Sequence, residues 1–264
     1  MSKSYWGNRV ADAQNAITDK SIDDVNRQMR IYYATTMNDA IAEFEATYDK
    51  LQATVEAGRE PTPADLYKLD KYWQLQAKMS QELEKLGDKE IRLLSKKFEA
   101  QFFEVYNAWA IEGQPAFNTL STQGVRQMIN SIWVADGKSW SERIWTNTRD
   151  LLSVLNDEMV KCVVNGKGTS ELRKQLMHQF NVSYNRADAL VRTEMAHIQT
   201  QAARERYRSY GIEEVEVLAD PDDRTCPVCA ALDKKRYPVN AVMPVPAHPR
   251  CRCTIVPVIK SRLS

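Results

Sequence analysis

Residues 220–253 decide how this chain is organised, and they read DPDDRTCPVCAALDKKRYPVNAVMPVPAHPRCRC. Four of the five cysteines and one of the three histidines of the sequence lie in this stretch. Their order is Cys226-x2-Cys229, then His248-x2-Cys251-x-Cys253. Two close pairs of sulfur and nitrogen donors, separated by a loop, are typical of a tetrahedral zinc site, because each pair supplies two ligands from one tight turn.

A tetrahedral zinc ion takes four ligands and this stretch offers five donors, so one donor is expected to stay outside the coordination sphere. We expect Cys226, Cys229 and His248 to bind together with one of the last two cysteines, and we favour Cys253 over Cys251. Nothing in the pattern indicates an open coordination position, so the predicted zinc is structural.

Two disulfides, or simply free thiols, are the alternatives to zinc. The chain begins without a recognisable secretory signal, and Cys162 stands alone within a helical pattern. That cysteine usage suits a reducing compartment, where disulfides are rare. Zinc is therefore the preferred interpretation.

The composition favours a helix-rich protein. The 264 residues include 36 basic and 35 acidic side chains, so no global positive field points to nucleic acid. Nine glycines among many Ala, Gln, Glu, Lys and Leu residues are typical of helices. No apolar run approaches the roughly twenty residues that a membrane span needs. We expect a mainly α-helical, intracellular protein without a membrane partner.

The first part of the chain predicts a flexible segment followed by long helices. Residues 1–20 are mostly polar and are expected to be flexible. Over 22–55, apolar residues recur every three or four positions, which predicts one long helix. Thr62 is a cap for a second helix, and Gly87 is expected to separate it from a third. Residues 21–112 therefore predict a long helical hairpin or bundle.

Residues 113–264 predict an α+β module. Its helices are expected after the capping residues Ser121 and Ser139, and over 171–180 and 183–210. Alternating and β-branched residues predict three short strands, at 213–218, 237–239 and 254–259. Because these strands flank the metal pattern, residues 220–259 are expected to form a small sheet pinned by zinc.

Charged residues before the metal pattern are expected to be structural. We predict an ionic network joining Arg192 and Glu194 to Asp223 and Arg224. A catalytic role for Glu194 is the alternative, but no phosphate-binding glycine loop or second acid or base accompanies it.

The other reactive side chains are isolated in the sequence. Cys162, His178 and His197 stand on helical patterns without companions at motif spacing. The sequence therefore predicts no enzymatic activity and no small-molecule substrate.

One local cluster of basic residues lies within the metal-binding stretch, residues 220–253. It consists of Lys234, Lys235, Arg236, Arg250 and Arg252. Such a cluster is usually a solvated face, and it is also a candidate for contact with DNA phosphates, with a salt-sensitive affinity.

Several motifs together resemble a known family. They are Tyr5-Trp6 with Arg9, WSERIW at 140–145, LVRTE at 190–194, DRTCPVC at 223–229 and HPRCRC at 248–253. In this order they resemble the minor head proteins of tailed bacteriophages, the head-morphogenesis family related to the Mu F protein. The marks are spread over nearly the whole chain, with residues 113–264 as the Mu F-like domain.

The resemblance implies a minor capsid protein of the virion, carried in few copies inside the head at the portal vertex and present in the host cytoplasm during assembly. It implies a role in procapsid assembly and in genome packaging or ejection. Its expected partners are the portal protein, other head proteins and, as for some family members, DNA. The alternative is a zinc-containing DNA-binding protein of the virion interior.

Overall fold

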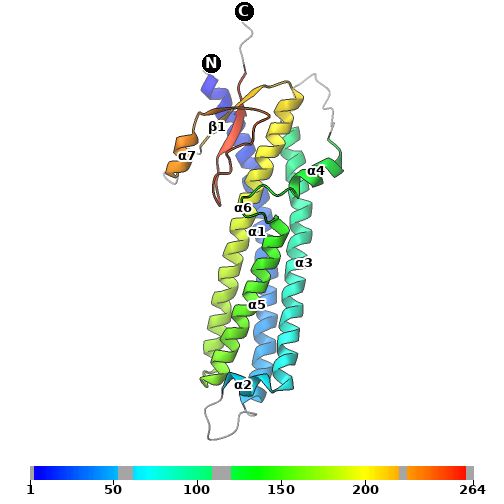
Figure 1. Cartoon of the computed structure of the whole chain (residues 1–264), viewed down its shortest axis with the longest axis vertical. Coiled ribbons are helices and arrows are strands. Elements are labelled where there is room, and N and C mark those ends of the chain that lie inside the picture. Colours follow the sequence, from blue (N-terminus) through cyan, green and yellow to red (C-terminus); the bar gives the residue numbers. More distant parts are fainter. Residues whose placement is uncertain (1–2, 53–61, 109–119, 220–224, 260–264) are drawn as a thin grey trace, which may run out of the picture. The chain divides into compact units, whose positions relative to one another are not determined.

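The chain is mainly α-helical, with a small sheet near its C-terminus (Figure 1). The computed structural model describes residues 3–52, 62–108, 120–219 and 225–259. Its elements are, in order, α1 (Lys3–Gln52), α2 (Pro63–Tyr67), α3 (Asp70–Asn107), α4 (Thr122–Ile129), α5 (Trp140–Val164), α6 (Thr169–Ser209), β1 (Glu214–Leu218), α7 (Pro227–Leu232), β2 (Arg236–Pro238) and β3 (Thr254–Pro257). The predicted fold class is confirmed. Among the described residues, every helix lacks the long apolar stretch that crossing a bilayer requires.

The residues form two compact units that are interleaved along the sequence. Unit 1 comprises Met1–Val25, Leu94–Trp140 and Ala189–Ser264, and unit 2 comprises Asn26–Leu93 and Ser141–Asp188. This differs from the expected succession of 1–20, 21–112 and 113–264. The reason is that α1, α3 and α6 each contribute residues to both units.

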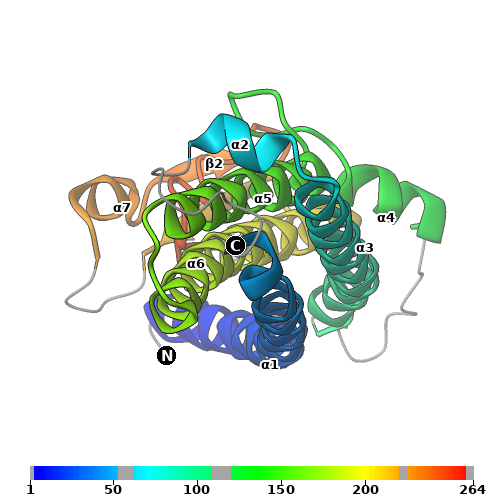
Figure 2. The same ribbon diagram turned by 90° about the horizontal axis from the view of Figure 1, so that it is seen from below.

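Unit 2 is a bundle of four helical segments, from α1, α3, α5 and α6. Figure 2 looks along these helices and shows them around a common centre. Glu43 pairs with Lys78, and Tyr32 lies against Lys89, so α1 and α3 run antiparallel. Apolar side chains fill the centre and provide most of the stabilisation through their burial. They include Phe44, Leu75, Met79, Leu83, Leu155, Leu176 and Phe180.

Helix α3 runs without a break through Gly87, so the predicted boundary between a second and a third long helix is wrong. An added Cβ at Gly87 would lie 2.7 Å from Cζ3 of Trp145 on α5. The glycine therefore gives the indole ring room against the backbone of α3, rather than ending the helix. The predicted cap at Thr62 is found, because its N–H donates to Asp65 Oδ2 at 3.0 Å, but it begins the short α2.

Helix α1 already begins at Lys3, so residues expected to form a flexible segment are helical. The apolar pattern misses this part because polar residues occupy its buried face. Gln14 and Thr18 are both buried, and Gln14 Nε2 donates to Tyr207 Oη at 2.7 Å. Thr18 donates to Gln199 Oε1 and accepts from Gln101 Nε2. Hydrogen bonds thus replace apolar contacts along this stretch of unit 1.

Helix α6 is also continuous, where two helices were expected over 171–180 and 183–210. Ser183, where the second of these helices was expected to begin, lies inside α6. Its carbonyl accepts a hydrogen bond from Asn147 Nδ2 at 3.0 Å, and its hydroxyl lies 3.5 Å from Tyr33 Oη. The serine therefore serves a contact between helices of unit 2.

The three predicted strands form one antiparallel sheet in the order β2-β1-β3. Val215 of β1 faces Tyr237 of β2, and Val217 faces Ile255 of β3. Both valines are fully buried. The central strand β1 ends at Leu218, just before the stretch that carries the metal pattern.

The Gly87 contact makes a testable prediction about stability. We expect Gly87→Ala to lower the free energy of unfolding by roughly 1–3 kcal/mol, because the new methyl group overpacks against Trp145. Urea denaturation followed by circular dichroism measures the change.

Gly124→Ala on α4 is the matched control. Its Cβ would meet Ser121 Oγ at an ordinary 3.4 Å, so we expect no loss, or a gain of up to about 1 kcal/mol from helix propensity. A Gly87→Ala protein as stable as the wild type would contradict the packing argument.

Candidate metal centre

The first donor pair is held by the start of α7. Cys226 is the N-cap of this helix, and its Sγ accepts a hydrogen bond from the N–H of Cys229 at 3.4 Å. Pro227 fills the first helical position, where its missing N–H is no loss. The two sulfur atoms therefore leave one short turn together, as the Cys-x2-Cys spacing predicts.

The second donor group begins with a tight turn at His248. The N–H of Cys251 donates to the carbonyl of His248 at 3.1 Å, and Arg250 within this turn has a φ of 62°. The N–H of Arg250 donates to Thr193 Oγ1 of α6 at 3.0 Å, which fastens the turn to the helix. Cys253 then directly precedes β3.

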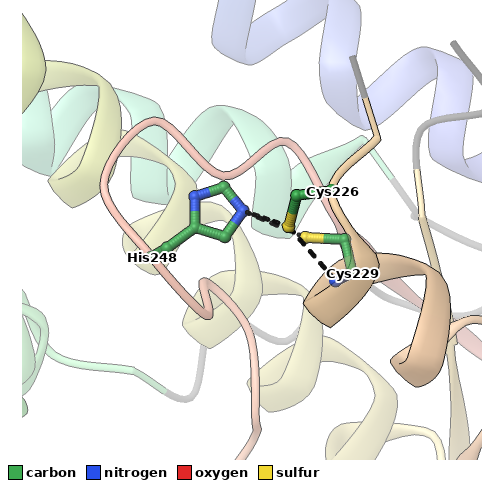
Figure 3. Close-up of side chains that lie close together, drawn as sticks. All are labelled: Cys226, Cys229 and His248. Carbon is green, nitrogen blue, oxygen red and sulfur yellow. Dashed lines mark hydrogen bonds between the residues drawn. The ribbon is translucent and has the colours of Figure 1, made fainter. Parts of the chain in front are cut away.

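The histidine ring is oriented for coordination. His248 Nδ1 lies 2.8 Å from the carbonyl oxygen of Pro249, and because a carbonyl can only accept, Nδ1 carries the proton. In the neutral ring this leaves the Nε2 lone pair free to bind a metal ion. Nε2 lies 3.3 Å from Cys226 Sγ and 3.1 Å from Cys229 Sγ (Figure 3).

The five predicted donors converge as two groups of three that share Cys229. Cys226, Cys229 and His248 form one group, and Cys229, Cys251 and Cys253 form the other; within each group the ligand atoms lie within 4.8 Å of one another. The sulfur atoms of Cys229 and Cys251 are 3.7 Å apart. Two thiolates bound at about 2.3 Å to one tetrahedral zinc ion would lie about 3.8 Å apart. This cluster could hold a metal ion.

The pKa values of the clustered thiols are shifted in opposite directions. Burial raises the pKa of Cys229 to about 12, whereas the N–H of Cys229 lowers the pKa of Cys226. A hydrogen bond from Cys253 lowers the pKa of Cys251 to about 5 and raises that of Cys253 itself. Several thiolates cannot share one small space without a positive charge. A bound dication supplies that charge and deprotonates its sulfur ligands.

The structure brings both Cys251 and Cys253 to Cys229, so the expectation that Cys253 is the fourth ligand stays a prediction. The structure forms no disulfide among the described cysteines of the metal stretch, Cys226, Cys229, Cys251 and Cys253. The two-disulfide alternative therefore has no support. Cys162 is buried elsewhere, on α5 in unit 2.

The predicted ionic network is only partly within the described residues, because Asp223 and Arg224 lie outside them. Glu194 is buried, and its Oε2 accepts a hydrogen bond from the indole N–H of Trp133 at 3.0 Å. Trp133 also stacks on His197, with ring centroids 4.1 Å apart. Sequence reasoning missed this Trp133 contact, because the tryptophan is distant in the chain and follows no helical pattern with α6.

The basic cluster is divided by the sheet. Arg236 begins β2, whereas Arg250 and Arg252 precede β3, and β1 lies between these two strands. Acidic neighbours accompany three of its side chains: Arg236 lies 3.0 Å from Glu216, Arg252 lies 3.6 Å from Asp19, and Lys234 lies 3.9 Å from Asp233. Lys235 is exposed beside them.

Fold and site together define a helical protein whose small C-terminal sheet carries a cysteine–histidine centre. A family model described as phage Mu protein F like protein matches residues 153–256. The matched region runs from α5 into β3 and includes all five candidate ligands. No curated protein and no solved structure matches the chain. The match confirms the resemblance for the motifs that it includes, at 190–194, 223–229 and 248–253, and supports a part in phage head morphogenesis.

The shared position of Cys229 predicts which ligand matters most. We expect Cys229→Ser to weaken zinc binding on the order of 100-fold or more, since about 10–16 kcal/mol of binding energy is divided among four ligands. Competition with a chromophoric chelator measures the affinity.

Cys162→Ala is the control, because this cysteine belongs to neither group of candidate ligands, and the variant should bind zinc as the wild type does. Cys251→Ser and Cys253→Ser, measured side by side, identify the fourth ligand as the one whose loss costs more affinity. Undiminished binding by Cys229→Ser would show that the cluster is not a metal centre.

Proposed function

We propose that this protein is a minor capsid protein that acts in phage head assembly at the portal vertex, inside the head. The observation that carries the proposal is the family match over 153–256, which includes the whole candidate metal centre. The motifs of the resemblance support it, and one of them can be followed in the fold. Trp140 opens α5, packs edge-on against Phe98 and donates its indole N–H to Asn130 Oδ1 at 3.1 Å.

In this proposal the metal is zinc and its role is structural. The two groups of donors that share Cys229 offer five ligands where a tetrahedral ion needs four, so the protein alone could saturate the ion and leave no position for a substrate. Zinc would join the start of α7 to the turn at His248, two segments that are far apart in the chain. The metal-binding energy then contributes directly to folding of this module.

We further propose that the protein acts by binding and not by catalysis. Glu194, the candidate catalytic carboxylate, is 3% exposed and hydrogen-bonded to Trp133, so it is not placed to meet a substrate. The expected partners are the portal protein and other head proteins, with the protein passing from the host cytoplasm into the virion. Genome packaging or ejection is the stage at which a portal-bound protein would act.

DNA binding is the less well supported alternative. Counterion release requires phosphates to meet cationic side chains that are otherwise solvated. Arg236 and Arg252 are exposed, but acidic neighbours, Glu216 and Asp19, partly neutralise them, and they belong to opposite edges of the sheet. A weak affinity that falls steeply with salt would revive this alternative.

Co-purification with the portal protein of the same phage tests the assembly role. We expect a defined complex by native mass spectrometry, because a protein of the portal vertex must recognise the portal itself. The portal of an unrelated phage is the control and should not bind. If the chain forms no complex with the portal protein of its own phage, this result would argue against the role.

Removal of the metal tests the structural role of zinc separately. With a chelator, we expect hydrogen exchange to become at least about tenfold faster over residues 225–233 and 248–257, because the ion no longer joins them. Peptides from residues 141–160 of unit 2 should be unchanged. Equal exchange with and without chelator would exclude a structural metal, whatever the portal experiment shows.

A further inference from the structure

Unit 2 contains a buried polar layer to which each of its four long helical segments contributes one side chain. The four are Tyr33 of α1, Glu90 of α3, Asn147 of α5 and Ser183 of α6. Tyr33 Oη accepts from Asn147 Nδ2 at 3.2 Å and lies 3.5 Å from Ser183 Oγ. The Tyr33 hydroxyl also hydrogen-bonds Glu90. The apolar centre of the bundle is therefore interrupted by one hydrogen-bonded group.

Glu90 is the unusual member of this layer. Its side chain is 1% exposed, and its Oε1 has no hydrogen-bond partner among the described residues. Its hydrogen-bond partner is the Tyr33 hydroxyl, which Asn147 and Ser183 contact in turn, and none of these three side chains is cationic. A carboxylate buried without a cation is costly, and such a group usually becomes neutral by taking up a proton.

Charged groups elsewhere in unit 2 have other partners. Arg30 of α1 donates from Nε to Tyr184 Oη at 3.0 Å. Lys89, the neighbour of Glu90, lies over the ring of Tyr32 on α1. Asp188 of α6, a second buried carboxyl of unit 2, accepts from Asn26 Nδ2 at 2.8 Å. Burial is the main cause of the shift at Glu90, and it raises the pKa from 4.5 to about 7, while the Tyr33 hydrogen bond lowers it in part. This direction agrees with the geometry.

We propose that the polar layer is a proton-controlled latch: protonated Glu90 closes the packing of α1, α3, α5 and α6 in unit 2, and ionised Glu90 loosens it. When protonated, the carboxyl donates to Tyr33 Oη, which is then free to donate to Ser183 Oγ. When ionised, it must take the Tyr33 proton for itself and remain charged in an apolar surrounding. One proton thus decides the direction of the hydrogen bonds and the stability of the bundle.

The sign of the pH dependence follows from the raised pKa. The folded unit holds the Glu90 proton more tightly than the unfolded chain, so between pH 4.5 and about pH 7 the folded state binds more protons. Stability from this group is therefore fully present at low pH and is lost as pH rises toward 7. Above that value the loss is complete and constant. Mildly acidic conditions tighten unit 2, and neutral to alkaline conditions loosen it.

Hydrogen exchange of the full-length chain tests the latch. After correction for intrinsic exchange, we expect the opening equilibrium of peptides around residues 80–93 and 141–150 to increase about 25-fold between about pH 5.5 and about pH 8. Glu90→Gln should remove this increase, because a neutral amide cannot ionise. Glu84→Gln, an exposed carboxyl on the same helix, should keep it. Peptides from residues 191–207 of unit 1 report any change that is not specific to unit 2.

A second variant keeps the carboxyl itself. Tyr33→Phe removes the hydrogen bond that lowers the pKa of Glu90, so the transition should move to higher pH. A wild-type unit 2 that opens equally at both pH values overturns the proposal, as does a Glu90→Gln protein with the wild-type pH dependence. If Glu90→Gln does not fold, an unshifted transition in Tyr33→Phe overturns it instead.

Discussion

The hydrogen bond from Gln199 Nε2 to Thr254 Oγ1, 2.8 Å long and fully buried, fixes where the C-terminal sheet can lie in unit 1. Thr254 in turn donates to Gln14 Oε1 of α1 at 2.6 Å, and Tyr207 donates to the carbonyl of Ile255 at 3.3 Å. Strand β3 is therefore held by α1 and α6 together. An unpaired polar group in this position would cost more than the bond contributes, so the arrangement tolerates little displacement.

This constraint reaches the metal centre through the chain itself. Cys253 directly precedes Thr254, and the turn at Arg250 is fastened to Thr193 of α6. Two of the segments that carry ligands are thus placed by the helices. A metal ion held by the cluster could join the Cys226–Cys229 turn to these two segments.

The clustering of the candidate ligands can be predicted from the sequence because the geometry within each pair is local. Cys226 and Cys229 are brought together by one helix start, and His248 and Cys251 by one turn, so spacing alone places each pair. The helices were harder to delimit. Gly87 has the appearance of a helix end, yet it serves Trp145, which lies 58 residues further along the chain. Gln14 and Thr18 have the appearance of a solvated segment. Yet Gln14 bonds Tyr207 and Thr254, and Thr18 bonds Gln101 and Gln199, all distant in the chain. Contacts of such long range leave no periodic trace in the sequence.

The interleaving of the two units has a consequence for synthesis on the ribosome. Every residue of unit 2 has been made once Asp188 is added, whereas unit 1 needs the last strand of the chain. Gln14 and Thr18 leave the exit tunnel long before Gln199 and Thr254 are translated. Until then they lack these two hydrogen-bond partners. A helix with Gln14 and Thr18 on its inner face is suited to this delay, because water satisfies these groups until their partners emerge. The polar buried face of this helix gives no apolar periodicity in the sequence. The same face can be hydrated while the chain is incomplete.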